Sequence, residues 1–184
     1  MATKAKKQSA SPLYLLRDIE KRAILNAAGL PQQDEAKTGW VGIGFKLGDL
    51  KLVAPLDEVV ELLTYPSLSR VPGTKKWVKG IANIRGNLLP IMDLSGYLTR
   101  KPTALTASSR ILVVRHAGIY SGLLVDEVLG LKHFLDEERS RTVPNVDNFI
   151  KTYLRGSCTQ DAQQWGIFSM YSLVESPLFM QVAV

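Results

Sequence analysis

The chain has 184 residues, of which 46% are hydrophobic and 22% charged, a balance typical of a globular protein and not of a disordered or fibrous one. Its apolar runs are no longer than a strand, which predicts no membrane insertion, and the single Cys158 excludes an internal disulfide framework and fits a reducing cytoplasm. The net charge of +6 is concentrated between residues 62 and 125, where nine Lys or Arg accompany one acid, so this block is either a solvated face or a surface for an acidic partner or nucleic acid.

The first 37 residues differ in texture from the rest of the chain. Residues 1–10 have the composition of a disordered tail. Ser11-Pro12 then combines a good N-cap with proline at the first helical position, and an apolar face repeats up to residue 28. We therefore expect a helix over 12–28 and a polar linker up to residue 37, with the main domain at 38–184.

From Trp40 onward the sequence predicts strands. Residues 41–49 alternate and end in a turn signal, and 50–56 return as the second arm of a hairpin. Residues 57–63 (DEVVELL) have two acids in their first turn and predict a short amphipathic helix. After a proline-rich loop, 79–85 and 88–94 read as two further strands.

A related unit recurs about seventy residues later, where 110–128 again predict a hairpin that ends in Asp-Glu-Val. Aligning Asp57 with Asp126 also aligns apolar positions of the two hairpins, and Ile84-Arg85-Gly86 has an echo in residues 154–156. The spacing is too long for a solenoid repeat and favours two related small β-barrels. A last strand and the start of a helix are expected at 165–174.

The stretch GIANIRGNLLPIMDL places an arginine between two apolar runs. Gly86-Asn87 is a two-residue hairpin signal in which glycine takes a positive φ, so Arg85 should stand at the end of the hairpin. Strand alternation puts Asn83 and Arg85 on one face. Pro90 cannot donate a ladder hydrogen bond and favours an edge strand.

These residues resemble the signature of the CheW family, and the downstream segments GLLVDEV and YLRG match it in order and spacing. The resemblance extends from Trp40 to Glu175. It implies a mainly β fold of two five-stranded SH3-like β-barrels with short helices, and an adaptor without catalysis or cofactor. Together with the segment AAGLPQQDEA, the pattern is most similar to the CheW-type proteins of type IV pilus chemosensory systems, which control twitching motility.

The resemblance also implies partners and contact residues. The partners are the regulatory domain of a CheA-type histidine kinase and the cytoplasmic tip of a methyl-accepting chemoreceptor, so the protein is expected in the cytoplasm, at membrane-anchored receptor arrays. The implied receptor contacts are Arg85, Val59 and Leu131. The implied kinase contacts are Glu61 and Lys79. The expected structural turn residues are Gly80, Gly86 and Asn87.

Each contact residue also has a purely structural interpretation. Arg85 could be tied into its own hairpin by hydrogen bonds to loop carbonyls. Val59 and Leu131 are apolar residues in a small domain, where a place in the core is the default, so their exposure in the isolated protein is the criterion.

Two other classes of function are alternatives to the adaptor role. The basic middle segment and three tryptophans would suit a β-barrel that binds nucleic acid, although only Trp77 stands among lysines. An enzyme would need paired carboxylates, a triad or a ligand cluster, and the sequence offers none. His116 and His133 have no second ligand at metal spacing, so no metal site is expected.

Overall fold

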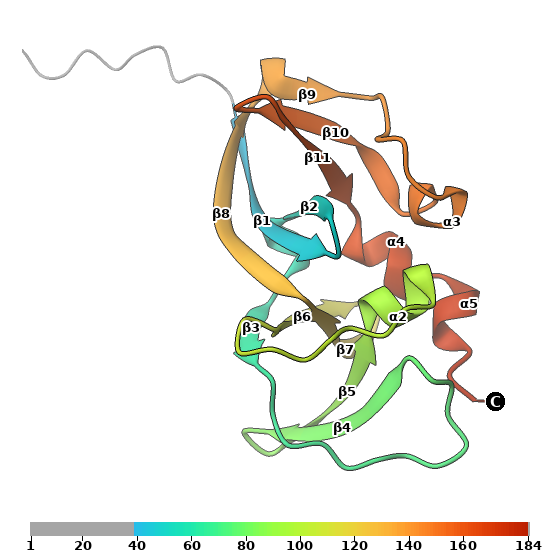
Figure 1. The fold of residues 1–184 in the computed structure, drawn as a ribbon. Helices are drawn as coiled ribbons and strands as arrows, with labels where there is room; N and C mark the ends of the chain where they lie inside the picture. Colours follow the sequence, from blue (N-terminus) through green and yellow to red (C-terminus); the bar gives the residue numbers. More distant parts are fainter. Residues whose placement is uncertain (1–38, 184) are drawn as a thin grey trace, which may run out of the picture. The chain divides into compact units, whose positions relative to one another are not determined.

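A computed structural model describes residues 39–183 of the chain. The described residues all lie in the main domain expected at 38–184. The helix expected at 12–28 lies outside the described residues. The mainly β class expected from the sequence is confirmed, with two curled sheets, one above the other in Figure 1.

The upper sheet has six strands in the order β8-β1-β2-β11-β10-β9, and the lower sheet has five in the order β3-β6-β7-β5-β4. The strands of the upper sheet are β8 (Glu127–Leu135), β1 (Gly39–Leu47), β2 (Leu50–Pro55), β11 (Gln163–Phe168), β10 (Leu154–Gln160) and β9 (Arg139–Ser140). The strands of the lower sheet are β3 (Glu61–Thr64), β6 (Arg110–His116), β7 (Ile119–Val125), β5 (Asn87–Asp93) and β4 (Val78–Ile84).

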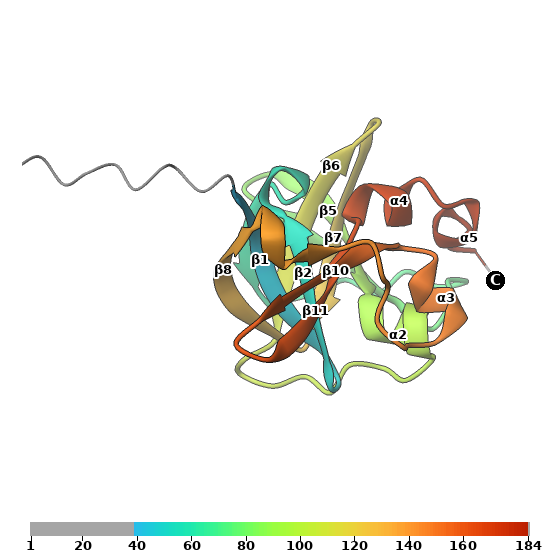
Figure 2. The same ribbon diagram turned by 90° about the horizontal axis from the view of Figure 1, so that it is seen from above.

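The described residues contain six short helices, and Figure 2 shows four of them, α2, α3, α4 and α5, together on one side. Two are single 3-10 turns, and the other four are α-helices of four to six residues. The six are η1 (Leu56–Glu58), α2 (Leu94–Thr99), η2 (Asp136–Glu138), α3 (Asn148–Lys151), α4 (Met170–Val174) and α5 (Pro177–Met180).

The two sheets exchange strands. After the β1–β2 hairpin of the upper sheet, the chain crosses and β3 pairs with β6 of the lower sheet. After the β6–β7 hairpin of the lower sheet, the chain crosses back and β8 pairs with β1. Each sheet has a small hydrophobic cluster of its own, and the largest cluster contains residues of both sheets and joins them.

The hairpin alignment expected from the sequence holds in the structure. Phe45 pairs with Leu52 in the first hairpin, and Val114 pairs with Ser121 in the second, so partners recur at a separation of 69 residues. The same offset relates the exchanged strands: Glu61 lies opposite Val113, and Gly130 lies opposite Gly44. The internal repeat is therefore a repeat of pairing register as well as of sequence.

Two expectations are wrong. Of the helix expected over 57–63, only Asp57 and Glu58 are helical, in η1, and Glu61–Thr64 is strand β3. Pairing with β6 and the β-branched Val59 and Val60 favour extended backbone here. Pro90 does not mark an edge, since β5 lies between β4 and β7. Pairing with β7 begins only at Ile91, so Pro90 leaves no hydrogen bond of that ladder unmade.

Candidate functional site

The arginine of the signature stretch lies in the turn between β4 and β5. Arg85 and Gly86 have φ values of 50° and 86°, and Ile84 pairs with Asn87 on either side of them. Positive φ at both central residues is the pattern of a type I′ turn, whose twist matches that of the flanking strands. The expected loop Gly86-Asn87 is therefore wrong by one residue, and Asn87 is the first residue of β5. The Oδ1 of Asn83 accepts the N–H of Gly86 at 2.9 Å and holds this arrangement.

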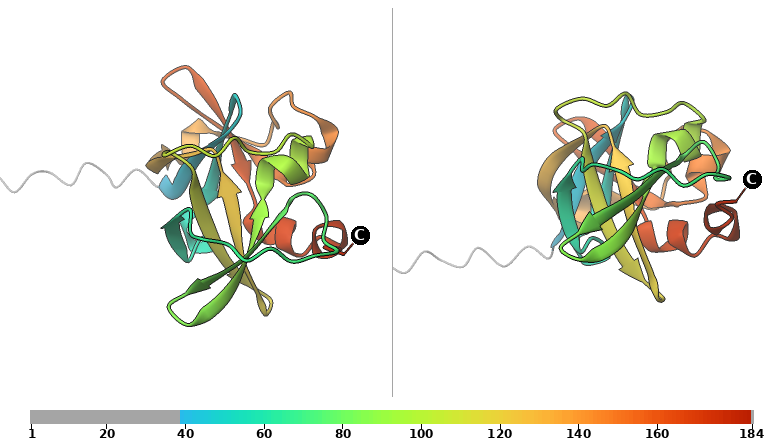
Figure 3. Two further views of the ribbon diagram at one scale, coloured as in Figure 1. Left: turned by 60° about the horizontal axis from the view of Figure 1, so that its bottom comes forward. Right: turned by 90° about the horizontal axis from the view of Figure 1, so that it is seen from below.

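The side chain of Arg85 forms an ion pair with Glu61 of β3, with 2.8 Å between Nη2 and Oε1. The Arg85 side chain is 79% exposed, and that of Glu61 is 26% exposed. Figure 3 shows the β4–β5 turn as a projecting tip of the lower sheet. An exposed pair of this kind contributes about 0–1 kcal/mol to stability. Because the Arg85 side chain is largely exposed, most of the guanidinium remains available to a partner. The structure thus brings together one residue expected at the receptor surface and one expected at the kinase surface.

The two apolar residues of the expected receptor surface differ in burial. Leu131 is on β8, opposite Ile43, and is 57% exposed. Val59 is only 9% exposed and packs in the main hydrophobic cluster. Exposure was the criterion for a contact, and Val59 does not meet it. The exposed side chain at this point of the chain is Val60, at 57%.

Lys79 lies at the other end of β4 from Arg85, roughly 20 Å along the strand at the usual rise per residue. The register of β4 against β5 shifts between Val78 and Gly80, so Lys79 occupies a β-bulge. Gly80 has a φ of 142°, and a Cβ there would overlap the carbonyl oxygen of Ser69. Gly80 is therefore needed for the close approach of the preceding loop.

Sequence reasoning missed Leu62 and the buried Glu58. Leu62 is 46% exposed on β3 and stands 69 residues before Leu131, so the repeat itself could have pointed to it. Glu58 is only 2% exposed; its carboxylate accepts hydrogen bonds from Ser169 Oγ and the N–H of Tyr171 and lies 3.3 Å from Arg155. It binds the N-terminus of α4, a tertiary contact that no local pattern predicts.

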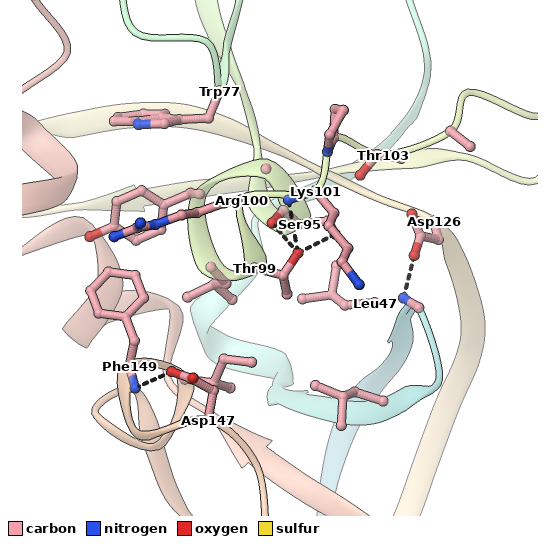
Figure 4. Close-up of a pocket in the computed structure, with 18 of the residues that line it drawn as sticks. Leu47, Trp77, Ser95, Thr99, Arg100, Lys101, Thr103, Asp126, Asp147 and Phe149 are labelled. Carbon is pink, nitrogen blue, oxygen red and sulfur yellow. Dashed lines mark hydrogen bonds between the residues drawn. The ribbon is translucent and has the colours of Figure 1, made fainter.

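A cavity of about 1340 Å³ lies beside α2 and is drawn in Figure 4. Its floor is aromatic, with Trp77, Tyr97 and Phe149. Two of its carboxylates are bonded to backbone: Asp126 accepts from Gly48 and Asp147 from Phe149. None of the residues expected to contact a receptor or a kinase lines this cavity.

The chemistry of the titratable groups offers no catalytic constellation within residues 39–183. Burial raises the pKa of the Cys158 thiol, which disfavours the nucleophilic thiolate. Burial and a hydrogen bond to Tyr153 raise the pKa of Tyr97. His116 Nε2 lies 2.6 Å from Glu175 and its ring stacks on Tyr171. No group of three or more His, Cys, Asp or Glu side chains in this part of the chain could hold a metal ion.

Each tryptophan packs against another aromatic ring, and Trp165 is buried while Trp40 and Trp77 are partly buried. Trp165 is 4% exposed, and Trp40 stacks on Phe134 at 5.3 Å between ring centroids. Trp77 stacks on Phe179 at 5.4 Å between ring centroids.

In the described residues, no helix is long and apolar enough to span a bilayer.

Comparisons with known proteins agree with the resemblance seen in the sequence. The model of the CheW-like domain matches residues 41–177. Protein PilI of Pseudomonas aeruginosa is 43% identical over 174 residues, which are 95% of this chain and 97% of that protein. The chemotaxis protein CheW of Helicobacter pylori is 31% identical over 113 residues, 61% of this chain and 68% of that protein. The scaffolding protein TtCheW of Thermoanaerobacter tengcongensis is similar in fold, with a TM-score of 0.67 at 23% identity over 76% of this chain and 95% of that one.

Proposed function

The chain belongs to the CheW family, and from this premise we propose that it is a non-catalytic adaptor that couples a chemoreceptor to a CheA-type histidine kinase. The observation that supports this role is the exposed Arg85 at a rigid turn, paired with Glu61. A guanidinium that keeps most of its surface in water can still bind a carboxylate or carbonyl of a helix tip. The likeness to PilI supports a place in a chemosensory system that controls type IV pili and twitching motility. The proposed place of work is the cytoplasmic face of a receptor array.

We propose that Arg85 and Leu131 contact the receptor and that Glu61 and Lys79 contact the kinase. Val60, not the buried Val59, would supply the apolar contact beside Glu61. Because Arg85 and Glu61 form an ion pair, the two partners would meet at this pair and would not occupy remote surfaces. The packed tryptophans give no support to the alternative of a nucleic-acid-binding barrel.

The test is a reconstitution with the cytoplasmic fragment of a chemoreceptor and a CheA-type kinase from the same cytoplasm. Arg85→Glu should weaken receptor binding about tenfold or more, because charge reversal replaces attraction by repulsion. Binding to the kinase's regulatory domain should fall by a smaller factor, since Glu61 itself is unchanged and only the charge beside it is reversed. Asp161→Arg, a charge reversal in the corresponding turn between β10 and β11, is the matched control and should leave both unchanged. If wild-type protein brings neither partner into a complex, the adaptor role is wrong.

A further inference from the structure

The loop between β3 and β4 forms a basic groove beside the edge of the lower sheet. In Figure 1 this loop runs below β4 and turns close to the C-terminus. The groove has a volume of about 500 Å³. Its walls carry four basic residues and no acid, whereas the larger cavity beside α2 carries both signs. The residues of the basic groove are Arg70, Val71, Pro72, Thr74, Lys75, Lys76, Val78 and Lys79.

The groove is fixed by the backbone at both ends. Ser69 and Ile81 exchange two N–H to carbonyl hydrogen bonds of 2.9 Å, which pin the loop to β4. The N–H of Lys75 donates to the carbonyl of Val182 at 2.9 Å, and Thr74 forms a β-bridge with Ala183. Since the backbone is held in place, a ligand would lose little affinity to ordering this loop.

The four charges have no acid partner within residues 39–183. Other basic residues of the domain do: Arg85 pairs with Glu61 and Arg155 with Glu58. No carboxylate of the described residues comes within 4.0 Å of the groove's basic side chains. Like charges held on one rigid loop repel one another, and an anionic ligand would relieve that repulsion. The groove accounts for four of the nine basic residues in the electropositive middle of the sequence.

We propose that the basic groove binds an acidic, extended peptide segment of a partner protein. Val71 is 37% exposed on its wall, so the segment would combine carboxylates with an apolar side chain. Single-stranded nucleic acid needs an aromatic face for its bases. The two aromatic residues of the loop do not line the groove: Trp77 packs against Tyr97 and Phe179, and Tyr65 packs against the hydrophobic cluster of the lower sheet. The proposal goes beyond the adaptor role, since only Lys79 is shared with the expected kinase surface.

The experiment uses the full chain and a fluorescein-labelled peptide of roughly twelve residues in which glutamates alternate with leucine and glycine. Fluorescence anisotropy measures the affinity for the peptide at about 50 mM and about 300 mM salt. The loss of affinity at the higher salt concentration reports how much of the binding is electrostatic. The test variant is Arg70→Glu with Lys76→Glu. The matched control is Lys101→Glu with Arg141→Glu, which lowers the net charge of +6 by the same four units at exposed sites outside the groove.

Wild-type protein should bind the acidic peptide but not the same peptide with glutamine in place of glutamate. The groove variant should bind about tenfold more weakly, while the control variant should lose less than about twofold. Equal losses in the two variants would mean attraction to net charge alone and would overturn the proposal. Tighter binding of a labelled oligothymidine or of vesicles with anionic lipid would also overturn it. Binding of the kinase domain, measured on the same variants, separates this outcome from failure of the adaptor role.

Discussion

The β4–β5 and β10–β11 hairpins have the same backbone plan. Each contains a β-bulge beside a glycine, Gly80 or Gly156, whose φ values are 142° and 145°. Each ends in a two-residue turn with positive φ at both positions, and each is followed by a short helix. The single bridge from Ser69 to β4 occupies the place that the two-residue strand β9 has beside β10. The two halves of the domain therefore share one backbone geometry, including the position of the β-bulge.

The chemistry of the two hairpins differs where the backbone does not. The first turn carries Arg85, which pairs with Glu61, and the second carries Asp161-Ala162. Glu58 follows the β1–β2 hairpin and is buried against α4. Its counterpart Glu127 follows the β6–β7 hairpin and is half-exposed beside Lys46. The comparison teaches that geometry alone does not mark a site. Side chains that differ between equivalent positions are the candidates for function or for special stabilisation.

The largest expected effect lies where the chain crosses between the sheets. Val59→Asp would place a carboxylate in the main hydrophobic cluster without a partner, and we expect a loss of about 3–5 kcal/mol in the free energy of unfolding. Its counterpart Val128 is half-buried, so Val128→Asp should cost less than about 2 kcal/mol. Urea denaturation measures both. Val60→Asp is the exposed control, and equal losses at 59 and 60 would show that Val59 is not a core residue.

The next effect tests the shared bulge. Gly80→Ala and Gly156→Ala would each force a Cβ against a serine carbonyl oxygen at a backbone conformation that favours glycine. We expect each to destabilise the fold by about 2–4 kcal/mol. Gly86→Ala has a positive φ but open space around it, so only the conformational cost of about 1 kcal/mol should appear. A clear difference between Gly80 and Gly156 in chemical denaturation would break the equivalence of the two hairpins.

A smaller effect should separate the two equivalent glutamates. Glu58→Gln removes the charge that accepts bonds at the start of α4 and faces Arg155, and should cost about 2 kcal/mol. Glu127→Gln changes a surface pair whose atoms are 3.9 Å apart and should stay within about 0.5 kcal/mol. Thermal unfolding of both variants checks the contrast. Similar melting temperatures would mean that burial of Glu58 contributes nothing.

The sequence predicted what depends on local pattern and on register. The alternating runs gave the hairpins, and the alignment of Asp57 with Asp126 gave their equivalence, which the pairing confirms. It could not predict the exchange of β3 and β8, because pairing between distant segments decides it. For the same reason the helix expected at 57–63 is mostly strand. The echo of Arg85-Gly86 in Arg155-Gly156 is also wrong, since register equates Arg155-Gly156 with Lys79-Gly80.

The candidate site was predicted residue by residue but not as an arrangement. The family signature pointed to Arg85 and Glu61, yet assigned them to different partners, since only the folded chain places the β4–β5 turn against β3. Burial of Val59 and exposure of Val60 depend on which face of a short crossing segment meets the core. With apolar residues adjacent at 59 and 60, alternation alone cannot choose between them.

The smallest expected effect on stability is also the sharpest test of what distinguishes the two turns. Arg85→Glu and Glu61→Arg each break the ion pair and place like charges together, and each should cost at most about 1 kcal/mol, because Arg85 is largely solvated. The double exchange should restore most of that loss, and a double-mutant cycle in urea measures the coupling. Asp161→Arg, at the equivalent turn, should change stability by less than about 0.5 kcal/mol.

The receptor affinity of the same variants then shows whether the ion pair or the guanidinium itself matters. If the exchange restores stability but not binding, the receptor requires the guanidinium at residue 85 itself. If it restores both, the pair acts by holding β3 and the turn together, and Arg85 is a structural tie. A coupling energy of zero would show that the pair does not persist in solution, and the difference between the turns would then reside in Arg85 alone.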